Sequence, residues 1–241
     1  MNDLSKVHKR EETLFTFMQG VKDCIPTLIG YISIGLASGI VGVSSNLSIV
    51  EVALLSALVY AGAAQFIICA LLVSGSPFSI IVFTTFIVNL RHFLLSMTLA
   101  PHFSEYSLKN NIGIGALLTD ESFGVAATQV AKGKKMTAQW MNGLNVTAYI
   151  SWILSCTTGA IFGKWIANPE VFGLDFALTA MFLALLVLQL QTVKKGKLTL
   201  YVSLIVYVII AMFVLCLFVP SYVAILLSTI IGATIGMVKD K

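Results

Sequence analysis

Two long stretches of this chain, residues 24–50 and 52–90, contain no charged side chain. A helix needs about 20 predominantly apolar residues to cross the hydrocarbon core of a bilayer, so each stretch exceeds the length of one crossing. Of all residues, 58% are hydrophobic and only 11% are charged, a balance typical of chains that cross a membrane several times. We therefore expect an all-α polytopic integral membrane protein.

Eight apolar windows are long enough to be transmembrane helices, and turn or charge signals separate them. They are residues 24–43, 52–73, 78–99, 112–130, 138–162, 176–193, 198–219 and 222–238. The fourth window contains Asp120 and Glu121, so it could instead be a re-entrant or half-inserted segment, which would leave seven spans. We expect a single transmembrane domain over residues 24–241, preceded at 1–23 by a cytoplasmic tail or a short interfacial helix.

The positions of the basic residues favour eight spans with both termini in the cytoplasm. Lys and Arg concentrate in cytoplasmic loops. With eight spans, every Lys and Arg except Lys109, Lys164 and the intramembrane Arg91 lies on the cytoplasmic side. If the fourth window did not cross, the cluster at 194–197 would move outside while the cluster at 132–135 stayed inside, and this asymmetry would weaken.

A polar stripe interrupts the apolar third window. On a helix Thr85, Asn89, His92 and Ser96 share one face, and Arg91 lies about 100° to the side. An arginine near the bilayer centre costs about 2.5–3.5 kcal/mol on insertion scales, so such residues usually face a protein interior or a wet cavity. We therefore expect the third span to line a polar site or pathway.

Arg91 has a possible partner at its own depth in the membrane. Arg91, Asp120 and Tyr60 each lie about 12 Å from the outer end of their windows, at about 1.5 Å of rise per residue. A buried cation is far less costly when a carboxylate compensates it. The pair could be a structural ion pair that fixes helix register, or it could handle substrate or protons. Glu121 points about 100° away from Asp120, so one carboxylate could meet Arg91 while the other meets water or a partner.

Other polar and small residues in the windows leave alternatives open. His92 could titrate or could be a hydrogen-bonded packing residue, and Gln65 could bridge helices or line a cavity. The small-residue patterns Gly35-x-x-x-Gly39 and 61–64 fit close helix packing, and they also fit broken helices that build midplane sites in transporters. A weak echo between residues 31–33 and 149–151, both Tyr-Ile-Ser, is compatible with a parallel four-plus-four repeat.

Catalytic and metal-binding motifs are missing from the sequence. No H-E-x-x-H, G-x-S-x-G or P-loop pattern occurs, and the three histidines are scattered. The net charge of +4 comes without the basic patch that nucleic-acid binding requires. We therefore expect no enzyme, no cofactor and no nucleic-acid partner. Transport would run on a gradient or on a separate motor.

Four segments give the chain a family resemblance. They are Gly-Tyr-Ile-Ser-Ile-Gly-Leu-Ala-Ser-Gly-Ile at 30–40, Ser-Ala-Leu-Val-Tyr-Ala-Gly-Ala-Ala-Gln-Phe at 56–66, Asn89-Leu-Arg-His92 and Thr119-Asp-Glu-Ser-Phe123. In this order they resemble the AzlC family, the large subunits of branched-chain amino acid exporters. The resemblance extends from about residue 20 to residue 190.

The resemblance implies a gradient-driven exporter of hydrophobic amino acids in the bacterial cytoplasmic membrane, acting with a small AzlD-type membrane subunit. A zwitterionic substrate needs one group for its carboxylate and one for its ammonium, and Arg91 with Asp120 or Glu121 would supply both signs. The motifs carry over as site candidates at Tyr60, Gly62, Gln65, Asn89, Arg91, His92, Asp120 and Glu121. A scaffold or assembly subunit that transports nothing is the alternative. An aqueous channel would need more pore-lining polar groups than the single stripe on the third span provides.

Overall fold

The computed structural model describes residues 16–133, 136–165, 183, 186–187, 190, 193, 195–219 and 221–239. Within these residues every regular element is a helix, which confirms the predicted all-α class. Four helices are long and apolar enough to cross a membrane: Phe17–Ser44, Phe78–Phe103, Ala138–Gly163 and Leu198–Leu215. The number of spans and the cytoplasmic position of both termini stay predictions.

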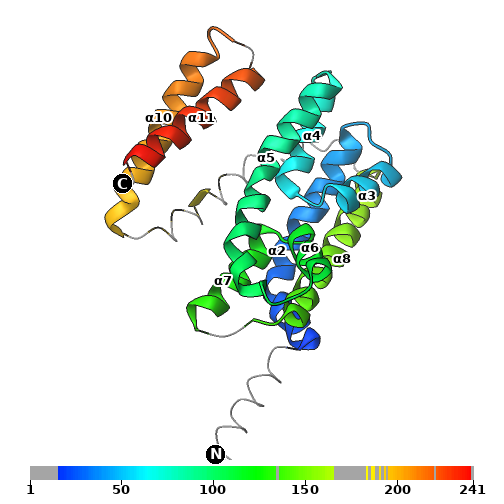
Figure 1. Ribbon diagram of the computed structural model, residues 1–241. Coiled ribbons are helices and arrows are strands. Elements are labelled where there is room, and N and C mark those ends of the chain that lie inside the picture. Colours follow the sequence, from blue (N-terminus) through cyan, green and yellow to red (C-terminus); the bar gives the residue numbers. More distant parts are fainter. Residues whose placement is uncertain are drawn as a thin grey trace, which may run out of the picture. The chain divides into compact units, whose positions relative to one another are not determined.

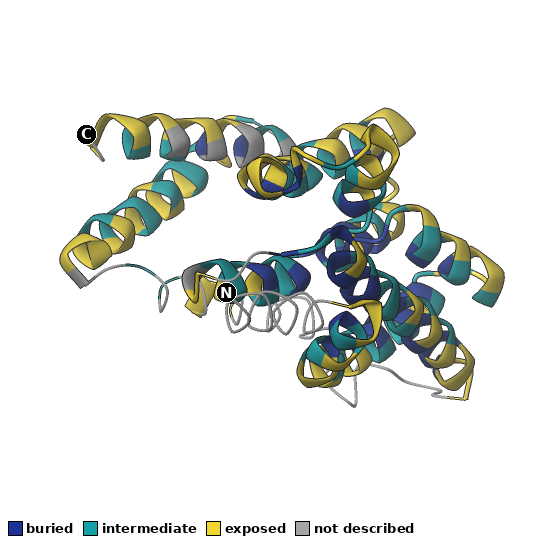
Figure 2. Ribbon diagram, turned by 60° about the horizontal axis from the view of Figure 1, so that its bottom comes forward, coloured by how far each residue is buried: buried dark blue, intermediate teal, exposed yellow. Residues whose placement is uncertain are grey.

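The chain forms two compact units, Met1–Leu178 and Thr179–Lys241. The first contains α2 (Phe17–Ser44), α3 (Ile49–Leu58), α4 (Gly62–Val73), α5 (Phe78–Leu99), the 3-10 helix η1 (Ala100–Phe103), α6 (Leu108–Ala116), α7 (Asp120–Ala131) and α8 (Ala138–Gly163). Its helices carry buried positions along one face and exposed positions along the other (Figure 2). The prediction of one domain over 24–241 stays untested, and the predicted interfacial helix lies largely outside the described residues.

Helices α2 and α8 pack side by side along most of their length and form the centre of the first unit (Figure 1). The two run parallel, because Gly20 lies against Trp140 and, further along both helices, Gly39 lies against Cys156. At Gly39 the backbones meet so closely that an added methyl group would overlap the Cys156 carbonyl. Of the two interpretations of the glycine pattern in the first window, close packing is therefore the one that holds.

The second window is not one helix. It is divided into α3, with 10 residues, and α4, with 12 residues. At 1.5 Å per residue these half-helices are about 15 and 18 Å long, so neither alone crosses a hydrocarbon core of about 30 Å. Between them Tyr60 has a φ of +41°, which no continuing right-handed helix allows. The interpretation of 61–64 as part of a broken span therefore holds.

The fourth window is interrupted as well. Helix α6 ends at Ala116 and α7 starts at Asp120, with 9 and 12 residues respectively. The assumption of one helix across 112–130 is therefore wrong, because Thr119 adopts an extended backbone and caps a new helix. Both interruptions are buried: Tyr60, Ala61, Leu118 and Thr119 are all at most 6% exposed. Irregular backbone at membrane depth is tolerated only in such places or beside a cavity.

The second unit contains a helical hairpin of α10 (Leu198–Leu215) and α11 (Ser221–Lys239), preceded by η4 (Lys195–Lys197). The two helices pack closely where Gly232 meets the side chain of Val208. Helix α10 has no buried residue, and its apolar surface is the kind that a lipid or protein neighbour covers. The sixth predicted window, 176–193, lies largely outside the described residues.

Candidate functional site

The break in the second span is stabilised by side chains that donate to carbonyl groups near the end of α3. Tyr149 of α8 donates its hydroxyl to the Ala57 carbonyl at 2.9 Å. The Gln65 side-chain amide donates at 3.4 Å to the Leu55 carbonyl, which also accepts from the Val59 backbone N–H. The last carbonyls of a helix can lack intrahelical partners, so the Tyr149 hydroxyl supplies a donor that the bilayer core does not offer.

Gln65 connects both sides of this break to the central helix pair. It is 2% exposed, and its side-chain oxygen accepts a hydrogen bond from Ser38 of α2 at 3.0 Å. The Cys156 thiol of α8 lies 3.8 Å from the same oxygen. Because its side-chain amide nitrogen donates to the Leu55 carbonyl of α3, Gln65 finds partners for its oxygen and its nitrogen within the protein. The interhelical-bridge interpretation of Gln65 therefore holds.

The break in the fourth span is closed at both ends. Asn145 of α8 donates its side-chain amide to the Ile114 carbonyl of α6 at 3.1 Å. On the other side Thr119 and Ser122 form a reciprocal capping box at the start of α7. The Thr119 hydroxyl also shares a short hydrogen bond with the Tyr31 hydroxyl of α2. This break is therefore anchored to both central helices.

The predicted ion pair is present. Arg91 Nη2 on α5 lies 2.9 Å from Oδ2 of Asp120, the first residue of α7. The two side chains are 33% and 30% exposed. Asp120 also gains from the positive end of the α7 dipole. The Arg91 Nε group is buried without a partner among the described residues. Arg91 is thus neutralised, while one of its donors is still available.

Glu121 is the second carboxylate in the first turn of α7, and it makes no ion pair with any described residue. Its charge acts on the phenols of Tyr31 and Tyr60 and on the imidazole of His92. Glu121 therefore lies within electrostatic range of α2, of the second-span break and of α5. It is a half-buried carboxylate beside the Arg91–Asp120 pair, without an ion-pair partner of its own among the described residues.

Aromatic rings fill the space between the two breaks. Tyr60 meets Tyr149 edge to face, with ring centroids 4.8 Å apart. Tyr31 meets Trp152 in the same manner at 6.1 Å. Such edge-to-face pairs fix ring orientation and each contributes about 0.5–1.5 kcal/mol beyond burial. Three of these rings come from α2 and α8, so the central helices determine the shape of this region.

The polar stripe of α5 faces the interior, as predicted. Thr85, Asn89, His92 and Ser96 are all half-buried. Large apolar residues between them are exposed, namely Val82, Phe83, Phe86, Leu90, Phe93, Leu94 and Met97. The Thr85 hydroxyl and the Asn89 side-chain oxygen are buried without a partner among the described residues. The stripe is thus a line of polar atoms with unused hydrogen-bonding capacity.

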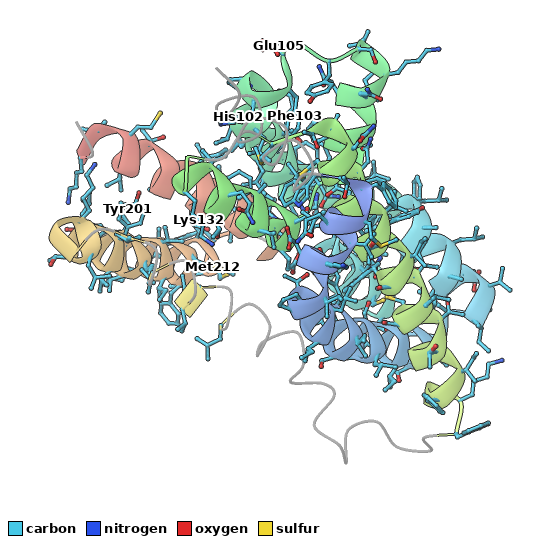
Figure 3. The ribbon with its side chains drawn as sticks, turned by 90° about the horizontal axis from the view of Figure 1, so that it is seen from below. His102, Phe103, Glu105, Lys132, Tyr201 and Met212 are labelled. Carbon is cyan, nitrogen blue, oxygen red and sulfur yellow. The ribbon has the colours of Figure 1, made fainter. Side chains whose placement is uncertain are left out.

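A cavity of about 230 Å³ lies between α5, η1 and α6. Phe93, Phe103, Ile114 and Leu118 are among its lining residues, and Phe103 is labelled on η1 in Figure 3. The lining is mostly apolar, with Ser96 as the end of the polar stripe. Since Leu118 directly precedes the cap of α7, the cavity borders the break in the fourth span.

The structure brings most of the predicted site residues to the two breaks. Tyr60 and Gly62 flank the second-span break, whereas Asp120 and Glu121 begin the helix after the fourth-span break. Arg91 and His92 reach the same region from α5. Gln65 is instead used in structural hydrogen bonds, and the Asn89 side-chain oxygen has no hydrogen-bond partner among the described residues.

Sequence reasoning did not single out three residues that shape the region: Tyr31, Thr119 and Trp152. Thr119 had a usable signal, because a threonine followed three residues later by a polar side chain marks a helix start. Tyr31 was noted only within the family segment and the internal echo, and Trp152 looks like an ordinary residue of an apolar helix. Asn145, like Gln65, is a polar residue inside a window for which an interhelical hydrogen bond was the leading interpretation, and it makes one with a carbonyl of α6. Their roles depend on contacts between distant segments.

Two interrupted spans, buried at their breaks and surrounded by ionisable and aromatic side chains, are the architecture of a polytopic helical transport protein. The chain belongs to the AzlC family. The family described as AzlC protein matches residues 26–166, which takes in α2 from Pro26 onward and all of α3 to α8.

Relatives from several microorganisms cover about three quarters of the chain. The Escherichia coli inner membrane protein YgaZ is 32% identical over 181 residues, 73% of this chain and 74% of that protein. The Bacillus subtilis branched-chain amino acid transport protein AzlC is 25% identical over 190 residues, 78% of this chain and 74% of that protein. An uncharacterized membrane protein of Archaeoglobus fulgidus is 29% identical over 184 residues, 73% of this chain and 76% of its own length. No solved structure matches the chain.

Proposed function

We propose that this protein is the large subunit of a two-component permease that exports hydrophobic amino acids, including branched-chain ones, on an ion or substrate gradient. The observation that carries the proposal is the pair of interrupted spans around Glu121, a carboxylate with no ion-pair partner among the described residues. Transporters bind substrates at such midplane breaks. The Bacillus subtilis relative, whose name refers to branched-chain amino acid transport, supports the substrate class.

The charges around the breaks suit a zwitterion. Arg91 is already neutralised by Asp120, so Glu121 is the carboxylate available for the ammonium group. We propose that the pathway is lined by Tyr60, Gly62, Asn89, Arg91, His92, Asp120 and Glu121, with Gln65 stabilising the break beside it through its structural hydrogen bonds. The half-buried stripe on α5 would extend this pathway along the third span.

The apolar cavity beside the fourth-span break supports a hydrophobic substrate. Its volume of about 230 Å³ exceeds that of a branched aliphatic side chain, and its walls are mostly apolar. Ligand sites combine such apolar walls with a few polar groups that fix orientation. A strongly polar side chain would lose its hydration in this cavity without compensation.

The assembly and location follow from the same proposal. The protein would act in the bacterial cytoplasmic membrane, with both termini inside and with a small AzlD-type membrane subunit as its partner. The exposed apolar surface of α10 is available to a membrane neighbour. Cysteine labelling after residues 135 and 197 tests the orientation, and both positions are expected to react only from the cytoplasmic side.

Counterflow of labelled leucine in proteoliposomes tests transport directly. The full chain reconstituted with the small subunit is expected to exchange leucine, isoleucine, valine or methionine, and the full chain alone is expected to exchange much less. A mutant that lacks Glu121 is the matched negative control. Full exchange by this chain alone would contradict the two-component assembly. No exchange of any of these amino acids, with a folded complex in the vesicles, would favour the scaffold alternative.

A further inference from the structure

The buried start of α4 has no acceptor for its free N–H groups. Its N-cap is Ala61, which provides no side-chain hydrogen bond, and its first turn contains no acidic residue. The backbone N–H groups of Gly62, Ala63 and Ala64 donate to no described residue. Ala61, Ala63 and Ala64 are at most 3% exposed, so these donors lie inside the protein. A helix end buried in this way normally has a partner.

A buried side-chain donor next to this helix start is also without a partner. The Trp152 indole N–H is buried without a hydrogen bond to any described residue, on a residue that is 5% exposed. The Tyr60 hydroxyl, on a residue that is 6% exposed, lies beside the Tyr31 hydroxyl and makes no hydrogen bond of normal length to a described residue. Tyr60 is the second residue before α4. Trp152 lies against the first residue of α4, since a methyl group added to Gly62 would be 2.9 Å from its Cη2 and 3.4 Å from its Cζ2. Cζ2 is next to the ring carbon that carries the indole nitrogen.

Two neighbouring hydroxyl groups already take part in hydrogen bonds, so they are not among the groups that remain unpaired at the start of α4. The Tyr149 hydroxyl bonds the Ala57 carbonyl, and the Tyr31 hydroxyl bonds Thr119. The unpaired groups are then backbone N–H, indole N–H and phenol O–H. All of them donate hydrogen bonds, and two of the three kinds cannot accept one. Such a set fits an anion, which a helix N-terminus also favours through its dipole.

We propose that the uncapped N-terminus of α4, together with Tyr60 and Trp152, binds the carboxylate of the transported amino acid. This inference rests on the proposed function and identifies the group that receives the negative end of the substrate. Arg91 is not that group, because Asp120 already neutralises it. Glu121 is the carboxylate left for the ammonium end, because it follows Asp120 in the first turn of α7 and has no ion pair with any described residue.

Three leucine analogues separate the two ends of the site. Leucinol lacks the carboxylate, 4-methylpentanoate lacks the ammonium, and leucine has both. Binding to the purified full-length chain, with the small subunit where it co-purifies, is measured as ligand-induced thermal stabilisation. Tyr60→Phe removes one donor and keeps the ring, and Trp152→Phe removes one donor and keeps a smaller aromatic side chain. Each is expected to weaken leucine binding about tenfold or more and to leave leucinol binding unchanged, because a hydrogen bond to a charged group is lost.

The opposite pattern is expected at the other end. Glu121→Gln should weaken leucine and leucinol alike and leave 4-methylpentanoate unchanged. Tyr149→Phe is the matched control, because it removes a nearby hydroxyl whose bond goes to a backbone carbonyl. It is expected to lower thermal stability without changing the ratio of leucine to leucinol affinity. Since each ratio is measured within one variant, a general loss of stability does not imitate the result.

The outcomes distinguish this inference from the proposed function. If leucine and leucinol bind the unmodified protein equally well, or if Trp152→Phe and Tyr60→Phe weaken both ligands to the same extent, the carboxylate does not bind at α4. Leucine counterflow would then still stand. If neither leucine nor any other hydrophobic amino acid binds or exchanges, the proposed function fails, and the carboxylate site fails with it.

Discussion

The two interrupted spans are alike in the half-helix before the break and differ in the half-helix after it. In both, a side chain of α8 binds a terminal carbonyl of the preceding half-helix: Tyr149 for α3 and Asn145 for α6. The following half-helices differ, because α7 has a capping box and two carboxylates in its first turn, whereas α4 has neither. The protein therefore binds a terminal carbonyl before each break and leaves the donor end after one of them without a cap.

This difference shows how a membrane protein separates stability from binding. A carbonyl left unpaired at membrane depth costs free energy and gains nothing, so it is bound by the protein itself. A free N–H end is equally costly, but it becomes useful when an anionic ligand arrives. The capped break supplies negative charge and the open break supplies donors. Four sets of variants test this contrast.

The largest effect is expected at the Arg91–Asp120 pair beside the capped break. Arg91→Met or Asp120→Leu alone should destabilise the protein by up to about 3–5 kcal/mol, toward the lower value because about a third of each side chain is exposed. The double variant should be milder. A double-mutant cycle that scores folded protein in the membrane and amino acid efflux separately measures the coupling. If the double variant recovers efflux as well as abundance, the pair is only structural; additive losses would mean that the residues are not in contact.

The two hydrogen bonds from α8 should act on different spans. Asn145→Leu and Tyr149→Phe each leave a buried carbonyl unpaired, at a cost of about 1–3 kcal/mol. Hydrogen exchange should rise in residues 108–116 for Asn145→Leu and in residues 49–58 for Tyr149→Phe. Each variant serves as the control for the other. Equal loosening of both spans by either variant would show that the breaks are not held independently.

A methyl group added after each break should have opposite effects. Gly62→Ala places a Cβ 2.9 Å from Trp152 and should destabilise by about 1–3 kcal/mol through overpacking. Gly124→Ala in α7 meets nothing within 4 Å and should stabilise by up to about 1 kcal/mol, because glycine is a poor helix former. Thermal unfolding of the purified variants measures both changes. A harmless Gly62→Ala would place Trp152 elsewhere than against α4.

The smallest effects on stability are expected from exchanging the caps. Thr119→Val removes the cap of α7 and should cost about 0.5–2 kcal/mol. Ala61→Ser adds an acceptor at the extended N-cap of α4 and should stabilise the protein by up to about 1 kcal/mol while weakening leucine binding, because the serine oxygen occupies the free donors. Thermal unfolding and leucine titration of the same samples measure the pair. Ala61→Ser that binds leucine as well as the unmodified chain would show that this end is not needed for binding.

Hydropathy and charge were sufficient to predict the helical class, the inward face of α5 and the contact between Arg91 and Asp120. These features depend on period, depth and the high free energy of an unpaired charge in a bilayer, all of which can be estimated from one segment at a time. The pairing prediction succeeded although its assumption of a continuous fourth helix was wrong. Asp120 reaches Arg91 as the first residue of a new helix.

The interruptions and their partners were harder to predict. Residues 52–73 and 112–130 read as apolar enough to be continuous, because nothing in composition distinguishes one long helix from two half-helices. What separates the halves is supplied by other segments: Tyr149 and Asn145 bind the carbonyls, and Tyr31 binds the Thr119 cap. These contacts join residues 31 to 92 positions apart and leave no periodic pattern in the sequence.

The backbone contact of α2 with α8 determines which parts of the first unit are able to move. At Gly39 and Gly159, which have no side chains, the main chains of α2 and α8 touch. Sliding one helix along the other would drive carbonyl groups into Cα atoms. The α2–α8 pair therefore behaves as one rigid body. The half-helices are joined to it by a few side-chain hydrogen bonds, made by Tyr149, Asn145, Gln65 and the Tyr31–Thr119 pair. We therefore expect the half-helices to turn relative to it at the breaks, residues 59–61 and 117–119. Access to the two membrane faces would then alternate through rotation of the half-helices about the fixed α2–α8 pair. One half of the protein would not rock against the other.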